Sequence, residues 1–172
     1  MYCEGYLWDA PDAKAAITVA MDTARAAGRL VAFALSDGFC VDRHRAEFLE
    51  MVEHRVDILF ANEDEIGSLY EVEDFDEALA AARAQVAVAC LTRGAQGSVV
   101  TTADEVVVVG VEPVEVVDTT GAGDLYAAGF LHGYTSGAPL AECGRLGAIA
   151  AAEVISHVGA RPQVSLADLV AP

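Results

Sequence analysis

The chain has 172 residues, of which 54% are apolar. That is enough for one domain with a core of ordinary size, and it excludes a chain that stays disordered. Asp and Glu number 27 against 10 Lys and Arg, which gives a formal net charge of -17. Binding to DNA, RNA or an anionic membrane requires basic surface. We therefore expect no nucleic-acid partner and no membrane partner.

The apolar runs are too short to cross a bilayer, which takes roughly 20 residues. Residues 86–91 and 106–109 are typical examples, and the amino terminus shows no secretory signal pattern. We expect a cytoplasmic protein. The four cysteines are scattered without a C-x-x-C pair, which favours buried free thiols over disulfides or a zinc site.

The first half of the chain alternates between apolar runs and stretches of helical periodicity. Asp9 is the predicted cap of the first helix, Pro11 stands in its first turn, and Gly28 stands where a left-handed residue would end it. The predicted strands are 2–7, 30–35, 57–60 and 86–91, and the later predicted helices are 43–53 and 74–84.

Strands that alternate with helices predict a mostly parallel sheet, and uninterrupted apolar strands predict helices on both of its faces. After residue 91, two close β-segments at 98–102 and 105–109 predict an antiparallel edge. Helices from Gly121 to Tyr134 and from Pro139 onward end the chain. We predict a single α/β domain over residues 1–172, with a doubly wound, mostly parallel sheet flanked by helices.

The most informative segment is 116–124, Val-Val-Asp-Thr-Thr-Gly-Ala-Gly-Asp, where we expect an apolar strand to lead through a glycine turn into a helix. The first amides of a helix have no intrahelical partner and lie at the positive end of its dipole. Gly121, Ala122 and Gly123 can therefore direct amides at a phosphate, and Asp124 can take a proton from an attacking hydroxyl. Simple capping by Thr120 explains the same residues and remains open.

Two other nucleotide sites fit the sequence less well. The spacing Gly121-x-Gly123-x-x-Ala127 matches a dinucleotide fingerprint, but a Ser-Gly-Ala-Pro break and a helix follow where that fingerprint needs a second strand ending in an acid. A phosphate-binding loop of the G-x-x-x-x-G-K type is absent from the sequence, whose single lysine is Lys14.

Two further segments follow predicted strands. Asn62 and Glu65 stand after the strand at 57–60, where they can orient hydrated Mg²⁺ or simply cap a helix. Thr92, Gly94 and Gly97 can wrap a nucleotide or form a plain turn. On the helix from Gly121, the small residues Ala127, Ala128, Gly129 and Gly133 predict close packing against the sheet.

In this order, the three segments resemble the PfkB, or ribokinase-like, family of carbohydrate and nucleoside kinases. Residues 118–124 resemble its carboxy-terminal signature, Asn62-x-x-Glu65 its N-x-x-E motif, and the segment from Thr92 to Gly97 its T-x-G-x-x-G motif. Residues 34–45, with Ser36-Asp37 and Arg43-His44-Arg45, and the run 57–62 resemble the adenosine-kinase-like branch. The resemblance covers nearly the whole chain.

The resemblance implies ATP-dependent phosphorylation of a sugar or nucleoside hydroxyl. Asp124 would then be the catalytic base, and the amides of Gly121, Ala122 and Gly123 would form the anion hole. The resemblance further implies that Asn62 and Glu65 organise Mg²⁺ through water and that Thr92, Gly94 and Gly97 contact ATP. It implies a monovalent cation such as K⁺ near Asp118 and Thr120, as in many relatives. It also implies an apolar adenine pocket drawn partly from the last helix and the loop around His157.

Members of this family are nearly twice as long, and their amino-terminal half supplies the acceptor site and a lid. The sequence therefore resembles the nucleotide-binding half alone, with that missing half or a second copy as an expected partner. A non-catalytic module that binds a nucleotide or a partner without an acceptor site is the alternative hypothesis.

Overall fold

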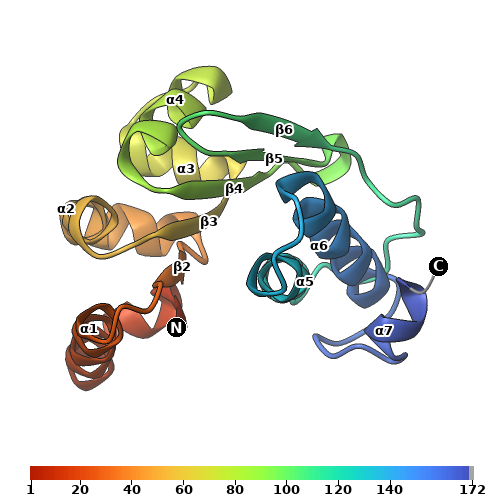
Figure 1. Cartoon of the computed structure of the whole chain (residues 1–172), viewed down its shortest axis with the longest axis horizontal. Helices are drawn as coiled ribbons and strands as arrows, with labels where there is room; N and C mark the ends of the chain where they lie inside the picture. The colour runs from red at the N-terminus through yellow and green to blue at the C-terminus, as the bar shows by residue number, and fades with distance from the viewer. Residues whose placement is uncertain (171–172) are drawn as a thin grey trace. The chain divides into compact units, whose positions relative to one another are not determined.

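The computed structural model describes residues 1–170 and contains one six-stranded sheet with strand order β1-β2-β3-β4-β5-β6 (Figure 1). Strands β1, β2 and β3 pair in parallel, with Phe33 opposite Cys3 on one side and Leu59 on the other. The strands are β1 Tyr2–Glu4, β2 Ala32–Ala34, β3 Ile58–Asn62, β4 Val88–Thr92, β5 Ser98–Thr101 and β6 Val106–Val109. The helices are α1 Pro11–Ala26, α2 Gly38–His54, α3 Glu63–Tyr70, α4 Phe75–Gln85, α5 Ala122–Thr135, α6 Leu140–Ile155 and α7 Leu166–Leu169, with short 3-10 helices η1 Gly5–Asp9 and η2 Gly94–Gln96. The predicted fold class, a mostly parallel sheet with an antiparallel edge and flanking helices, is confirmed.

The chain divides into two compact units. Unit 1 contains Met1–Leu91 with Thr101–Glu105, and unit 2 contains Thr92–Val100 with residues from Val106 onward. Each unit is described by itself below.

The core of unit 1 joins one face of its strands to four helices. Phe33, Leu59 and Leu91 are fully buried on that face, and they belong to the same cluster as Met21 and Phe48 from α1 and α2. Strand residues of the opposite face, such as Ile58 and Cys90, are buried as well. Burial of both faces explains why the sequence of these strands is apolar without alternation.

The start of unit 1 departs from the prediction for residues 2–7. The strand ends at Glu4, and Gly5 begins η1, where its amide donates to Ser36 Oγ at 2.9 Å. A Cβ on Gly5 would collide with the carbonyl oxygen of Leu35, so only glycine permits this close approach. Asp9 does not cap α1; Ala10 holds the cap position and Pro11 the first turn. The predicted ending is confirmed, because Gly28 has φ +66° and the Arg29 amide bonds back to Ala24.

Helix α2 begins five residues earlier than the predicted helix at 43–53. The carboxylate of Asp37 accepts a hydrogen bond from the Phe39 amide at 2.7 Å and caps the helix at Gly38. The helix bends at His44, whose backbone angles of -120° and 15° are not helical. Because the helical geometry is interrupted at His44, the residues before it do not continue the periodicity of the residues after it, and the sequence pattern missed the first part of the helix.

In unit 2, helices α5 and α6 pack directly on each other (Figure 1). A Cβ on Gly129 would collide with the Leu146 carbonyl oxygen, and one on Gly147 would lie 2.9 Å from the Tyr126 carbonyl oxygen. Gly133 likewise faces Cys143. The prediction that the small residues of α5 allow close packing against the sheet is therefore wrong for Gly129 and Gly133, which allow close contact between two helices.

The strand predicted just before Gly121 does not form. Val116 and Val117 are 59% and 55% exposed and lie in a loop. The Val117 amide donates to the Ile155 carbonyl oxygen at 2.8 Å, at the end of α6. The apolar residues before α5 therefore form a loop that is hydrogen-bonded to the end of α6, and Val116 and Val117 do not enter the core.

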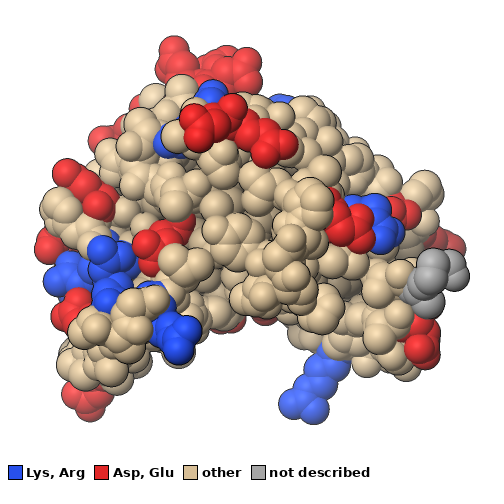
Figure 2. Space-filling model, in the orientation of Figure 1, with Lys and Arg blue, Asp and Glu red and all other residues tan. Residues whose placement is uncertain are grey.

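Figure 2 shows basic side chains lying beside acidic ones on the visible face. In unit 1, Arg25, Arg43, Arg45 and Arg55 each pair with at least one Asp or Glu, and Lys14 pairs with Glu47. Among the described residues, no helix combines the length and hydrophobicity needed to traverse a lipid bilayer. Cys3, Cys40, Cys90 and Cys143 are free and buried, as predicted.

Candidate active site

The glycine turn before α5 leads directly into the amino-terminal end of that helix. Gly121 is the N-cap residue with φ +84°, and Ala122 and Gly123 are the first two helical residues. The Ala122 amide donates to the Thr119 carbonyl oxygen at 3.2 Å, which tightens the turn. Asp124 is the third helical residue and is exposed. This arrangement places a carboxylate directly beside an amide-lined, electropositive helix end.

Two glycines of this turn face different surroundings. A Cβ on Gly121 would stand 2.9 Å from the Cβ of Ala160, so the turn is pressed against the loop that follows α6. A Cβ on Gly123 would meet nothing within 4 Å. Because no protein atom requires glycine at position 123, its missing side chain leaves free space above the helix end, where an anion can approach the backbone.

Asp118 holds the turn together. Its Oδ1 accepts hydrogen bonds from the Thr120 amide and hydroxyl at 2.9 and 2.7 Å, and its Oδ2 accepts one from the Gly159 amide at 3.0 Å. These bonds, that from Gly159 first, lower the pKa of Asp118 to about 2. Capping by Thr120, the simpler interpretation, is not what the structure shows, because the Thr120 hydroxyl donates to Asp118 and α5 has no side-chain cap.

An apolar pocket of about 460 Å³ opens beside this turn, within unit 2. Thr119, Ala122 and Gly123 form one part of its wall, and the turn between β4 and β5 forms another. The volume lies within the range of small-molecule sites. The remaining wall comes from the loop after β6 and from one side of α6, with the lining residues Gly110, Val111, Glu112, Pro113, Val114, Val116, Ala148, Ala151, Ala152 and Ile155.

The structure brings Thr92, Gly94 and Gly97 to the same pocket as Gly123. Gly94 and Gly97 have φ of +52° and +85°, and the Arg93 amide donates to the Gly97 carbonyl oxygen at 2.7 Å, which closes a tight turn. Two predicted segments that are separate in the sequence, 92–97 and 118–124, therefore line one cavity.

The α6 side of the pocket was not predicted residue by residue. Ala148, Ala151, Ala152 and Ile155 recur at helical spacing and form a small, apolar face. That spacing was a usable signal, although it resembles ordinary helix packing. His157 does not line the pocket; its Nε2 lies 3.3 Å from Glu153 Oε1.

Asn62 and Glu65 lie in unit 1 and form a complete capping box at the start of α3. Asn62 Oδ1 accepts from the Glu65 amide at 2.8 Å, Glu65 Oε2 accepts from the Asn62 amide at 2.9 Å, and Asn62 Nδ2 donates to Glu65 Oε1 at 2.8 Å. Burial raises the pKa of Glu65 to about 7. The capping interpretation of this pair is therefore confirmed, whereas its predicted role with Mg²⁺ stays a prediction.

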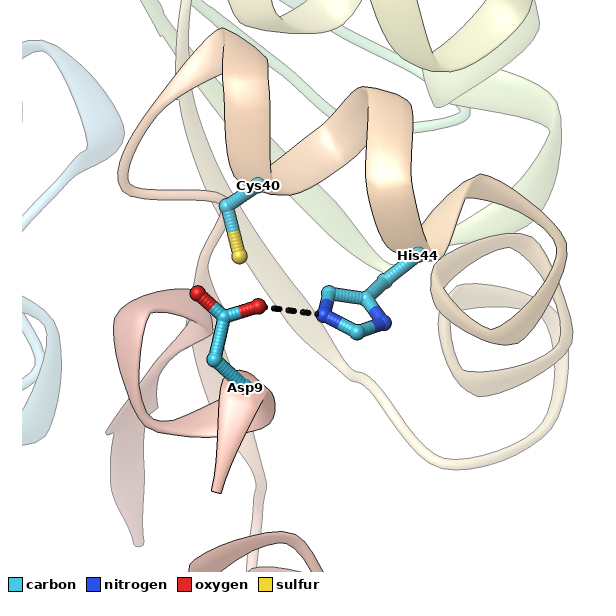
Figure 3. Close-up of side chains that lie close together, drawn as sticks. All are labelled: Asp9, Cys40 and His44. Carbon is cyan, nitrogen blue, oxygen red and sulfur yellow. Dashed lines mark hydrogen bonds and ion pairs between the residues drawn. The ribbon is translucent and has the colours of Figure 1, made fainter. Parts of the chain in front are cut away.

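A second cluster in unit 1 contains Asp9, Cys40 and His44 (Figure 3). Although potential metal-ligand atoms of all three lie within 4.8 Å of one another, Arg43 occupies both oxygens of Asp9, at 3.1 and 2.7 Å. His44 Nε2 lies 2.7 Å from Asp9 Oδ1, and the Cys40 thiol donates to the Gly5 carbonyl oxygen. A guanidinium at this carboxylate opposes a second cation. The cluster therefore functions as an ion-pair connection between η1 and α2, and its bonds from Arg43 and His44 lower the pKa of Asp9.

The chain is similar to several known kinases. The cytidine kinase of Thermococcus kodakarensis is 38% identical over 118 residues, which cover 67% of this chain and 42% of that protein. The nucleoside kinase of Methanocaldococcus jannaschii is 34% identical over 128 residues, covering 71% and 40%. The crystal structure of adenosine kinase from Sinorhizobium meliloti superposes with a TM-score of 0.95 at 55% identity, and covers 98% of this chain and 52% of that one.

The chain thus spans about half the length of the relatives it matches. The family model described as pfkB family carbohydrate kinase matches residues 1–166. Motif, fold and family model agree over nearly the whole chain, which belongs to the pfkB family of carbohydrate kinases.

Proposed function

We propose that this chain is the nucleotide-binding part of an enzyme that transfers the terminal phosphoryl group of ATP to a hydroxyl of a nucleoside or sugar. The observation that carries the proposal is the apolar pocket of unit 2, whose wall includes the open helix end at Gly123. An apolar cavity suits a nucleobase, and a helix amino terminus suits phosphates. A nucleotide presents both chemistries at once.

Asp124 is the proposed catalytic base. It would accept the proton of the acceptor hydroxyl while that oxygen bonds to the terminal phosphorus and the bond to the departing ADP breaks. The amides of Gly121, Ala122 and Gly123 would stabilise the negative charge on the transferred group, and that of Ala122 would exchange its 3.2 Å bond to the Thr119 carbonyl oxygen for one to the phosphoryl group. Thr92, Gly94 and Gly97 would contact ATP from the part of the pocket wall that lies at the turn between β4 and β5.

A nucleoside is the preferred acceptor class. Relatives named cytidine kinase, nucleoside kinase and adenosine kinase support this preference. That these relatives are kinases also favours catalysis over a non-catalytic binding module. Because the chain spans half of their length, we further propose that a preceding half of the protein, or a second copy, completes the acceptor site. Tyr6, Leu7 and Phe39 in unit 1, which are 58%, 51% and 77% exposed, are candidates for such a contact.

Mg²⁺ and K⁺ would supply positive charge to the phosphates. Each oxygen of Glu65 accepts one hydrogen bond, so lone pairs remain for a water-mediated contact with Mg²⁺, together with Asn62. Asp118, ionised down to a pH of about 2, and Thr120 would hold the monovalent cation. The Asp118 carboxylate fits a cation by charge, and Glu65, whose pKa is about 7, fits Mg²⁺ by charge in its ionised form.

Calorimetric titration with Mg-ATP, with and without K⁺, tests the proposal on this chain. Gly123→Val fills the free space above the helix end, so saturable binding should occur in the wild type and disappear in this variant. Absence of binding by the wild-type chain at millimolar nucleotide would refute a self-contained nucleotide site. In a form of the protein that turns over, Asp124→Asn should lower kcat by about 10²- to 10⁴-fold without altering the melting temperature. Unchanged turnover would refute the assignment of the base.

A further inference from the structure

Glu153 is a buried carboxylate that the proposed chemistry does not use. It lies in the last turn of α6, and its side chain is 8% exposed. Its Oε1 accepts hydrogen bonds from the Gln163 and Val164 amides at 2.8 and 3.3 Å and lies 3.3 Å from His157 Nε2. Its Oε2 is buried and has no hydrogen-bond partner among the described residues.

This position is unfavourable for α6 alone. A negative charge near the carboxy-terminal end of a helix opposes the helix dipole, and burial of a carboxylate costs free energy unless partners compensate. The compensating donors all come from the segment 157–164, which follows the helix. The Glu153 carboxylate therefore stabilises the conformation of the loop 157–164, although its charge is unfavourable at the end of α6.

The same loop touches the glycine turn before α5. The Gly159 amide donates to Asp118 Oδ2 at 3.0 Å, and the Cβ of Ala160 occupies the space into which a side chain at Gly121 would project. Glu153 holds both ends of this contact segment: His157 lies just before Gly159 and Ala160, and the two amides lie just after them. A displacement of the loop would release Asp118 and open space behind Gly121.

We propose that Glu153 is a positioning residue for the phosphate-binding turn. Its carboxylate fixes the loop 157–164, the loop presses Ala160 against Gly121 and binds Asp118 through Gly159, and the amides that follow Gly121 are thereby held ready for an anion. The role in phosphate binding rests on the function proposed above; the mechanical coupling between Glu153 and the turn does not. Fixed donors matter because an error of about 1 Å in a binding or catalytic group can cost about 10²-fold in rate.

Amide hydrogen exchange of the whole chain tests the coupling without a ligand. In Glu153→Ala, peptides covering 157–164 and those covering 118–123 should both exchange about tenfold faster, as expected for loss of hydrogen bonds to a charged group. Glu153→Gln keeps an acceptor oxygen for the two amides and should remain within about threefold of the wild type. Glu142→Ala removes an exposed acid from the same helix, where it pairs with Arg145, and should leave both regions unchanged.

Faster exchange confined to 157–164 would overturn the proposal, because the turn would then be independent of the loop. If Glu153→Ala does not fold, Glu153→Asp provides the test. This variant keeps the negative charge, but its side chain is one methylene shorter, so its oxygens no longer reach the loop amides. Both regions should therefore exchange faster than in Glu153→Gln. Equal exchange in Glu153→Asp, Glu153→Gln and the wild type would also overturn it.

Ligand binding then separates the coupling from the proposed function. Mg-ATP should bind about tenfold more weakly to Glu153→Ala, or to Glu153→Asp if the first variant does not fold, while adenosine, which lacks phosphates, should bind as to the wild type. Equal loss for both ligands would indicate a general structural role and contradict the proposal. If the wild type binds no Mg-ATP, the proposed function fails for this chain, while the exchange result still confirms or refutes the coupling.

Discussion

The amide of Gly159 donates a hydrogen bond to the carboxylate of Asp118, 41 positions earlier in the chain. This bond connects the loop after α6 to the turn before α5, and Thr120 adds two more donors to the same carboxylate. Three donors around one half-buried acid explain why the pKa of Asp118 falls to about 2.

The first prediction concerns the acid titration of Asp118. Its pKa in the folded chain lies below the ordinary value of 3.8, so its contribution to stability is present above pH 3.8 and is lost as pH falls through about 2. Carbon-detected NMR of the side-chain carboxyl should show a midpoint near 2. A midpoint near 4 would contradict the hydrogen bonds described. Asp118→Asn should speed amide exchange at Gly159, while Asp104→Asn, in the loop between β5 and β6, should not.

The second prediction separates folding from binding at Gly123. A methyl group there meets no protein atom, and alanine is favoured over glycine in a helix. Gly123→Ala should therefore raise the free energy of unfolding by about 0.5–1 kcal/mol, measured in urea, while weakening Mg-ATP binding. Ala128→Ser, at an exposed position of the same helix, should leave nucleotide binding unchanged. A variant that is stabilised but binds nucleotide normally would remove Gly123 from the site.

The third prediction uses the contact between α5 and α6. Gly129→Ala places a methyl group against the Leu146 carbonyl oxygen, a backbone atom that cannot rotate away. The two helices must separate, and the free energy of unfolding should fall by about 1–3 kcal/mol. Urea denaturation measures this loss, and Gly123→Ala, the same substitution six positions earlier in the chain without the steric contact, is the matched control. Equal stabilities would show that the helices pack less closely than described.

The fourth prediction concerns Glu65. Because burial raises its pKa to about 7 in the folded chain from an ordinary 4.5, the folded state binds more protons than the unfolded state between these values. The contribution of Glu65 to stability should therefore decrease as pH rises from about 4.5 to about 7. Glu65→Gln cannot titrate, so the difference in unfolding free energy between wild type and variant should change across this window and be constant above pH 8. A difference that is flat from pH 5 to 8 would show that Glu65 titrates normally.

Local chemistry predicted the elements whose ends are determined by nearby residues. Helix α4 begins at Phe75, directly after the predicted start Asp74, which is its N-cap and whose carboxylate accepts from the Asp76 and Glu77 amides. Helix α1 ends at Ala26, and Gly28 just beyond it adopts the predicted left-handed conformation. The turn at Gly121 and the helix that follows it were also predicted, because positive φ and helix caps depend on residue types only a few positions apart.

Features that depend on distant partners were not predicted. Val116 and Val117 resemble a strand by composition, yet their segment bonds to Ile155 at the far end of another helix. Asp9 resembles a cap, yet its carboxylate binds Arg43 and His44, more than 30 positions away. Glu153 stands alone in an apolar helical run, which was a signal of a special environment, but its loop partners cannot be inferred from sequence spacing.

The four buried cysteine thiols can serve as natural probes of local opening in the chain. A thiol that reacts only when its surroundings open reports how often that opening occurs, and Cys3, Cys40 and Cys90 lie in unit 1 while Cys143 lies in unit 2. Burial raises the pKa of Cys3 to about 12, which further protects it in the closed state. The rate of alkylation at each cysteine, measured by mass spectrometry, would therefore report the rate of local opening in each of the two units separately, without any introduced label.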